Sequence, residues 1–85
     1  MKMKYIIIRK ARMEVPLVFS ELLLHGDVAG KNKVASAGFC ELAADRKWKV
    51  SGQSVSLKLD ARPQDAEILN AHLSFANRTN THLNK

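Results

Sequence analysis

Three histidines and one cysteine are the residues of this 85-residue chain best suited to metal binding or nucleophilic catalysis. They are His25, His72, His82 and Cys40. No histidine has a second one four residues away, which is the spacing that places two metal ligands on one face of a helix. The acidic residues are few and scattered, so a pair of carboxylates for acid–base catalysis would have to be assembled entirely by the fold. We therefore expect no catalytic residue, no metal and no cofactor, and we predict that the protein is not an enzyme.

Lysine and arginine are the more distinctive residues, because the chain has 14 of them and only 8 acidic residues, a formal net charge of +6. One basic group lies in the first 13 residues, which hold no acid, and another begins at Arg46. If the first and fourth strands lie close together, the two groups form one patch beside Trp48. Such a patch offers charges for phosphates and a ring for base stacking, as a nucleic-acid surface requires. The residues of this predicted basic patch are Lys4, Arg9, Lys10, Arg12, Arg46, Lys47, Trp48 and Lys49. The alternative is that these charges keep strand edges soluble and prevent edge-to-edge pairing.

The elements that position these residues are predicted to be mainly strands. Apolar runs and alternation predict strands at 4–10 and 12–19, joined by a tight hairpin, and at 34–42. Pro16 cannot donate a hydrogen bond to a neighbouring strand, so the second strand is expected at a sheet edge or with a bulge. Gly38 inside the third strand indicates either a bulge or a closely packed neighbour.

A fourth strand is predicted to begin near Trp48, but its alternation changes parity within residues 51–54. A bulge or a bend at that point would restore a single buried face. The competing interpretation is a turn that divides the segment into two short strands.

Two helices are predicted from capping residues and helical spacing. The first begins after Ser20, a good N-cap, and ends at Gly26 or Gly30, because a glycine readily terminates a helix. The second covers about residues 63–76, where apolar residues recur at helical spacing. Asp65 lies in its first turn, where a carboxylate complements the positive end of the helix dipole.

The order of elements, β-β-α-β-β-α, predicts an α+β fold with a mainly antiparallel sheet of about four strands. A C-terminal helix and a short central helix are expected to pack on this sheet. A single domain is expected over residues 1–77. Residues 78–85 are polar and are expected to form a mobile C-terminal tail.

The first strand has four consecutive apolar residues, Tyr5 to Ile8, so both of its faces need cover. The C-terminal helix can cover one face, and the other needs the short helix or a second subunit. Because a chain of this size buries only about 60–65% of its unfolded surface, we predict a homodimer. The candidate interface residues are Tyr5, Ile6, Ile7, Ile8, Leu22, Leu23 and Leu24.

The leading functional hypothesis is a small non-enzymatic protein-interaction module that binds a second copy of itself and then a protein partner. It rests on the surplus of apolar residues and on the lack of a catalytic grouping. The alternative is a nucleic-acid-binding protein that uses the basic patch.

Two features of the chain indicate the cellular compartment of the protein. Cys40 is the only cysteine, so no internal disulfide can form, and a free thiol in an apolar strand is typical of a buried residue in a reducing compartment. The apolar run after the N-terminal lysines is too short for a secretory signal, and no stretch approaches the roughly 18–20 apolar residues of a membrane span. We expect a cytoplasmic protein with no membrane association.

In general character the chain resembles short open reading frames of bacterial prophages and other mobile elements, although no motif carries this resemblance.

Overall fold

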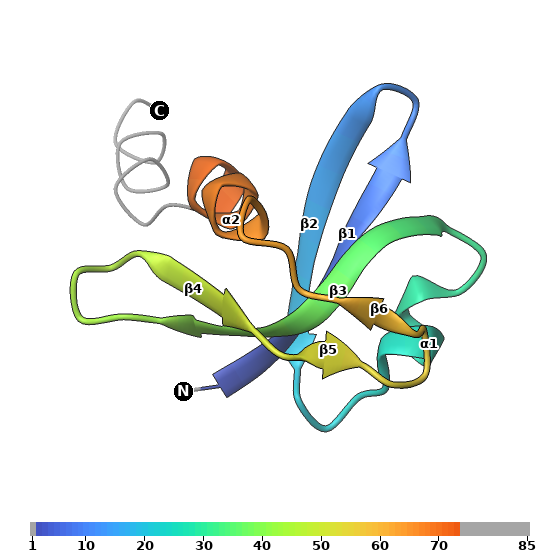
Figure 1. The fold of residues 1–85 in the computed structure, drawn as a ribbon, viewed down its shortest axis with the longest axis horizontal. Helices are drawn as coiled ribbons and strands as arrows, with labels where there is room; N and C mark the ends of the chain where they lie inside the picture. Colours follow the sequence, from blue (N-terminus) through green and yellow to red (C-terminus); the bar gives the residue numbers. More distant parts are fainter. Residues whose placement is uncertain (1, 74–85) are drawn as a thin grey trace, which may run out of the picture.

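The computed structural model of the chain describes residues 2–73 and contains six strands and two helices. In chain order these are β1 (Lys2–Lys10), β2 (Met13–Ser20), α1 (His25–Ala29), β3 (Lys33–Leu42), β4 (Trp48–Ser51), β5 (Gln53–Ser54), β6 (Leu59–Asp60) and α2 (Asp65–Leu73). Strands β1 to β4 form an antiparallel sheet in the order β2-β1-β3-β4, and β5 and β6 form a separate two-stranded ribbon (Figure 1). The predicted α+β fold, with a four-stranded antiparallel sheet, a central helix and a C-terminal helix, is confirmed. The predicted tail at 78–85 lies outside the described residues.

β1 is a central strand of the sheet, and α2 covers one of its faces. Tyr5 and Ile7 point to this face, and both are fully buried. They form one hydrophobic cluster with Cys40 of β3 and Leu69 of α2. The predicted cover of the first strand by the C-terminal helix is therefore confirmed.

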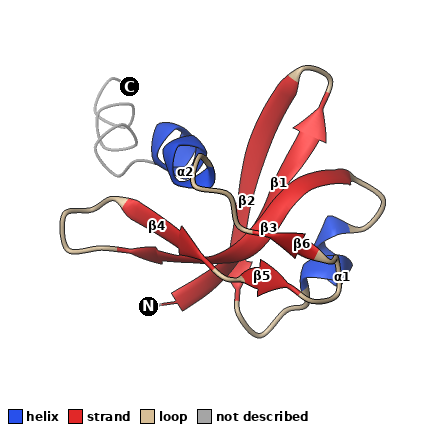
Figure 2. Ribbon diagram, viewed as in Figure 1, coloured by secondary structure: helices blue, strands red, loops and turns tan. Residues whose placement is uncertain are grey.

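The other face of β1 is covered by α1 and by the β5–β6 ribbon. Ile6 is fully buried there, in a second cluster with Phe19, Ala29 and Ala37. Leu59 of β6 packs against this cluster. Figure 2 shows the arrangement, with α1 beside the ribbon and α2 beside β2 and β4.

A single copy of the chain thus encloses the strand that was expected to require a partner. Tyr5, Ile6 and Ile7 each have 0% of their surface exposed. The prediction that these three residues contribute to an interface is wrong, because none of their surface reaches solvent. Ile8 is half-buried and packs against the second cluster.

The change of parity predicted within residues 51–54 marks the point where the chain leaves the main sheet. Gly52 has a φ of 75°, and β5 on its far side pairs with β6 instead of with β3. The backbone N–H of Ala61 donates to the Gly52 carbonyl, which holds the ribbon against the end of β4. The segment is therefore divided into two short strands by a bend, without the reversal of direction that a turn would give.

The short helix begins later than predicted. Ser20 does not cap it, because its Oγ accepts a hydrogen bond from the Leu22 N–H at 3.1 Å and its carbonyl accepts one from the Leu23 N–H. These bonds close a turn, and α1 begins only at His25 and ends at Gly30, which has a φ of 56°. Residues 22–24 therefore lie in a loop, where no helix face buries them.

The C-terminal helix begins at Asp65, two residues after its predicted start, and is described to Leu73. The rest of its predicted extent lies outside the described residues. Residues 63–64 form a turn before it, in which the Ala66 N–H donates to the Pro63 carbonyl. Neither helix within residues 2–73 is long and apolar enough to span a membrane.

The β1–β2 hairpin has an unfavourable turn residue. Lys10 pairs with Met13, so Ala11 and Arg12 form a two-residue loop in which Ala11 has a φ of 57°. A positive φ at the first loop residue is typical of a type II′ turn, which prefers glycine there. β2 lies at the sheet edge, as predicted from Pro16.

Substitution of Ala11 by glycine is expected to raise the free energy of unfolding by about 0.5–1 kcal/mol. A left-handed φ costs an L-residue roughly 1–2 kcal/mol, and the larger unfolded-state entropy of glycine offsets part of that gain. Urea denaturation of Ala11→Gly and wild type measures the difference. Ala44→Gly is the control, because Ala44 is also exposed in a hairpin loop but lacks a positive φ, and it should lose stability. A loss of stability in Ala11→Gly would contradict the argument.

Candidate functional site

The structure does not bring the two predicted basic groups together. Arg9, Lys10 and Arg12 lie at the hairpin end of β1. Lys49 lies on β4, opposite Glu41, at the end of β3 that pairs with the start of β1. Because β1 has nine residues, its two ends are separated by about 25–30 Å. Of the first group, only Lys2 and Lys4 lie near the second, and β3 separates β1 from β4.

Arg46 and Lys47 lie in the exposed loop between β3 and β4. The backbone N–H of Lys47 donates to the Asp45 carboxylate. Both side chains are therefore at the tip of a hairpin, beyond the paired part of the sheet.

Trp48 does not lie beside the lysines of the sheet. It packs against the first cluster, next to α2, and its ring N–H donates to the Leu73 carbonyl at 3.4 Å. The Asn70 side chain also bonds to the backbone of Trp48: Asn70 Oδ1 accepts from the Trp48 N–H at 2.7 Å, and its Nδ2 donates to the Trp48 carbonyl. Asn70 thus covers an unpaired position on the edge strand β4, and the Trp48 ring holds α2 in place instead of offering a stacking surface.

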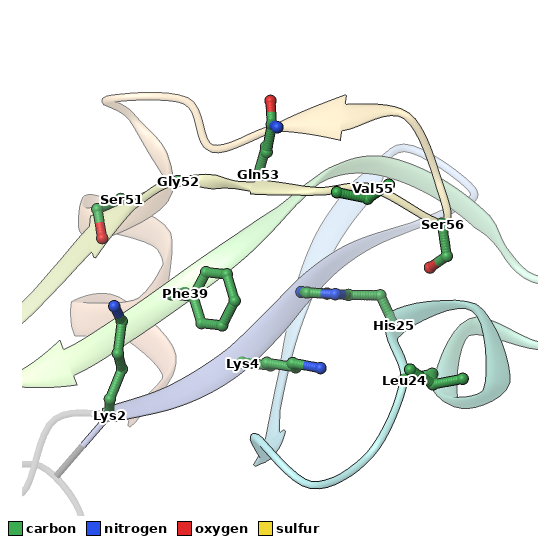
Figure 3. Close-up of a pocket in the computed structure, with 10 residues that line it drawn as sticks. All are labelled: Lys2, Lys4, Leu24, His25, Phe39, Ser51, Gly52, Gln53, Val55 and Ser56. Atoms are coloured by element: carbon green, nitrogen blue, oxygen red, sulfur yellow. The ribbon is translucent and has the colours of Figure 1, made fainter.

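The opposite face of the sheet carries a groove of about 570 Å³, which we call the Phe39 groove (Figure 3). Its lining residues are Lys2, Lys4, Leu24, His25, Phe39, Ser51, Gly52, Gln53, Val55 and Ser56. Phe39 on β3 pairs with Lys4 of β1 on one side and with Ser51 of β4 on the other. The ring therefore lies near the centre of three strands, at the floor of the groove.

Two ammonium groups lie over the Phe39 ring. The Nζ of Lys2 is 5.0 Å from the ring centroid, and the Nζ of Lys4 is 6.0 Å from it. Lys2 and Lys4 share a face of β1 because side chains alternate along a strand. Lys49 reaches the same face through its pairing with Glu41, two residues after Phe39.

His25 forms one wall of the Phe39 groove and is itself buried. Its Nε2 donates to the Gly38 carbonyl at 2.8 Å, since that oxygen can only accept. The imidazole packs at nearly right angles to Phe19 and Phe39, with ring centroids 5.6 and 5.8 Å away. The first histidine of the chain thus serves to hold the Phe39 ring in position.

The loop at residues 22–24, which we call the leucine turn, borders the groove. Leu22, Leu23 and Leu24 are 90%, 50% and 59% exposed. Lys4 Nζ donates to the Leu23 carbonyl at 2.7 Å and ties this loop to β1. Leu24 lines the groove and Val55, also exposed, lines it from the ribbon.

A polar network with a buried centre, Tyr5 and Asp65, joins β1, β2 and α2 on the other face. Tyr5 Oη donates to Asp65 Oδ2 at 2.5 Å, and Arg62 donates to Asp65 through its backbone N–H and its Nε, both at 2.9 Å. Arg62 also reaches Glu14 of β2 at 3.0 Å, and Glu14 accepts from Arg9. From its position in the sequence, Asp65 was expected only to complement the helix dipole.

The network is suited to holding elements together rather than to proton transfer. Burial, together with the hydrogen bond to Asp65, raises the pKa of Tyr5 far above its usual range. The hydrogen bond from Arg62 lowers the pKa of Glu14. Each group therefore keeps its ordinary charge at neutral pH, with Tyr5 neutral and Glu14 ionised.

The remaining candidate residues for chemistry are not gathered in the described part of the chain. Cys40 is buried, as predicted for an apolar strand, and burial raises the pKa of its thiol to about 12. His72 is exposed on α2, and His82 lies outside the described residues. Within residues 2–73 no three His, Cys, Asp or Glu side chains are grouped so that they could hold a metal ion.

Comparison with protein-family models, curated proteins and solved structures gives no match for this chain. The two surfaces that bear on function are therefore the leucine turn and the Phe39 groove.

Proposed function

We propose that this protein is a small, non-catalytic binding protein that associates with another protein, in the first place a second copy of itself, through the leucine turn. The observation that supports the proposal is the exposure of three consecutive leucines in a molecule that completely buries Tyr5, Ile6 and Ile7. A single exposed leucine is ordinary on a protein surface, whereas neighbouring exposed apolar side chains are typical of an interaction site. We also propose a cytoplasmic location, since a free buried thiol suits a reducing compartment.

The position of the leucine turn is fixed, which favours binding. Its backbone is held by the Ser20 hydroxyl and by Lys4 Nζ, so the leucines need little further ordering when a partner arrives. Full burial of one leucine contributes ~1.5–3 kcal/mol, so two or three of them supply much of the affinity of a small interface.

Sedimentation equilibrium over the micromolar range tests this proposal. We expect wild type to form dimers and the double variant Leu22→Glu, Leu23→Glu to remain monomeric, with association weakened at least about 100-fold. Met13→Glu is the matched control, because Met13 is exposed at the far hairpin and should leave the dimer intact. Monomer alone in wild type would refute self-association, and dimers that the leucine variant leaves unchanged would refute the leucine turn as the interface.

A further inference from the structure

We propose that the Phe39 groove binds single-stranded nucleic acid, with one base stacked on the Phe39 ring and the flanking phosphates held by Lys2 and Lys4. This site borders the leucine turn, with which it shares Leu24 and the Lys4–Leu23 hydrogen bond. It differs from the predicted basic patch, with which it shares only Lys4. The proposal rests on the ring, on the cations above it and on the charge of the groove.

The Phe39 ring is placed as a stacking platform. Figure 3 shows it face-on between Lys2 and His25, with the imidazole beside its edge. Gly52 allows the β4–β5 backbone to pass close by, because a Cβ there would lie 3.0 Å from the ring. The ring is thus held in a fixed position by its neighbours, and stacking on a fixed ring accepts any base.

The two lysines are placed to contact phosphates on either side of that base. Both ammonium groups lie within 6.0 Å of the ring centroid. An ammonium group has three N–H donors, so Lys4 can donate to a phosphate oxygen while it keeps its hydrogen bond to the Leu23 carbonyl. The groove lining contains these two lysines and no acidic residue. Glu41 is paired with Lys2 on the neighbouring strand but does not line the groove.

The walls of the groove favour a base over a purely ionic ligand. Leu24 and Val55 form an apolar rim on two sides, and Ser51 and Ser56 add hydroxyl groups. An acidic peptide would use the lysines but would leave the flat aromatic floor with no matching surface. We therefore expect binding to single strands with little preference for sequence, since stacking and phosphate contacts do not read base edges.

Fluorescence anisotropy with labelled oligo-dT and oligo-U of about ten nucleotides, measured over a salt series, tests this site. For two phosphate contacts to a single strand, the slope of log affinity against log salt is expected near −1.4. Lys2→Gln with Lys4→Gln should abolish most of that slope. Phe39→Leu should weaken binding roughly tenfold or more and leave the slope unchanged, because it removes stacking and no charge.

The matched control is the double variant Lys10→Gln, Arg12→Gln, which removes the same charge at the far end of β1 and should bind like wild type. An equal loss in this control would overturn the proposal, since binding would then follow net charge alone. Displacement of the oligonucleotide by polyglutamate at equal charge concentration would overturn it in favour of an acidic peptide. Absence of binding to either oligonucleotide at low salt would also overturn it. The lysine variants alter one exposed and one half-buried surface side chain, so their result does not depend on the folding of Phe39→Leu.

Discussion

Substitution of Asp65 by alanine is expected to lower the free energy of unfolding by about 3–5 kcal/mol. Asp65 has no exposed surface and accepts hydrogen bonds from Tyr5 and from Arg62. Its removal leaves the buried Tyr5 hydroxyl without this acceptor and Arg62 without one of its two carboxylate partners. Breaking one member of a buried charged pair has this magnitude in other proteins, because the remaining groups stay desolvated. Since small domains are stable by only ~5–15 kcal/mol, this loss removes a large part of the total stability.

Urea denaturation followed by circular dichroism measures this change, and two further variants identify its cause. Glu67→Ala removes an exposed carboxylate from the same helical turn and should cost only about 0.3–1 kcal/mol, the value of the helix dipole alone. Tyr5→Phe keeps the Asp65–Arg62 pair and removes a single donor, so it should cost about 1–2 kcal/mol. If Asp65→Ala lowered the free energy of unfolding as little as Glu67→Ala does, the buried network would have no part in stability.

The sequence could place Asp65 in the first turn of a helix but could not reveal this network. Tyr5 and Asp65 are 60 positions apart, and their contact depends on which face of β1 receives α2. Helix capping and dipole effects are local, so they were visible from residue types alone, whereas a long-range hydrogen bond requires the complete arrangement of strands. The same limit explains why Trp48 was expected beside the lysines and lies instead against α2.

The strands were predictable because their apolar patterns are strong, and the cover of β1 was predictable only in part. The parity change near Gly52 correctly marked a break in the fourth strand. It did not show that the next residues form a ribbon over the sheet, because β5 and β6 have only two residues each and no periodicity can be read from them. That ribbon, together with α1, supplies the cover that was assigned to a second subunit.

The Phe39 groove was missed for a related reason. Lys2 and Lys4 have the same parity, which places them on one face of a strand, but Phe39 joins them only through the pairing of β1 with β3. Register between strands is set by side-chain packing and turns, so it could not be obtained from the charge pattern. The available signal was an aromatic residue one position after Gly38, in a strand rich in small residues.

Gly38 is the position at which a substitution is expected to disturb the backbone of this site most. A Cβ at this position would lie 2.7 Å from the Ser51 carbonyl oxygen and 2.9 Å from the Ala61 Cβ, both closer than side-chain carbons come in folded proteins. The glycine therefore allows the end of β4 and the chain after β6 to cross directly over β3. This close packing was one of the two explanations expected from the sequence, and it is confirmed.

Substitution of Gly38 by alanine is expected to lower the free energy of unfolding by about 1–3 kcal/mol, the usual cost of an added methyl group in a tightly packed site. The methyl group must displace the Ser51 backbone and Ala61, because neither of the contacted atoms is the end of a flexible side chain. The Gly38 carbonyl also accepts the His25 hydrogen bond, so the wall of the Phe39 groove should move with it. Urea denaturation measures the loss, and amide chemical shifts of residues 51–56 report the displacement.

Gly26→Ala provides the matched control for this change. Gly26 lies inside α1, and an added Cβ there would be 3.5 Å from its nearest neighbour, the Ser56 Oγ, which is ordinary van der Waals contact. Alanine is favoured over glycine in a helix by roughly 0.5–1 kcal/mol, so this variant should be as stable as wild type or slightly more stable. A Gly38→Ala variant that unfolds at the wild-type urea concentration would show that the ribbon can shift at no cost. In that case the crossing above β3 would not hold the Phe39 groove rigid, and the stacking platform proposed there would lose its support.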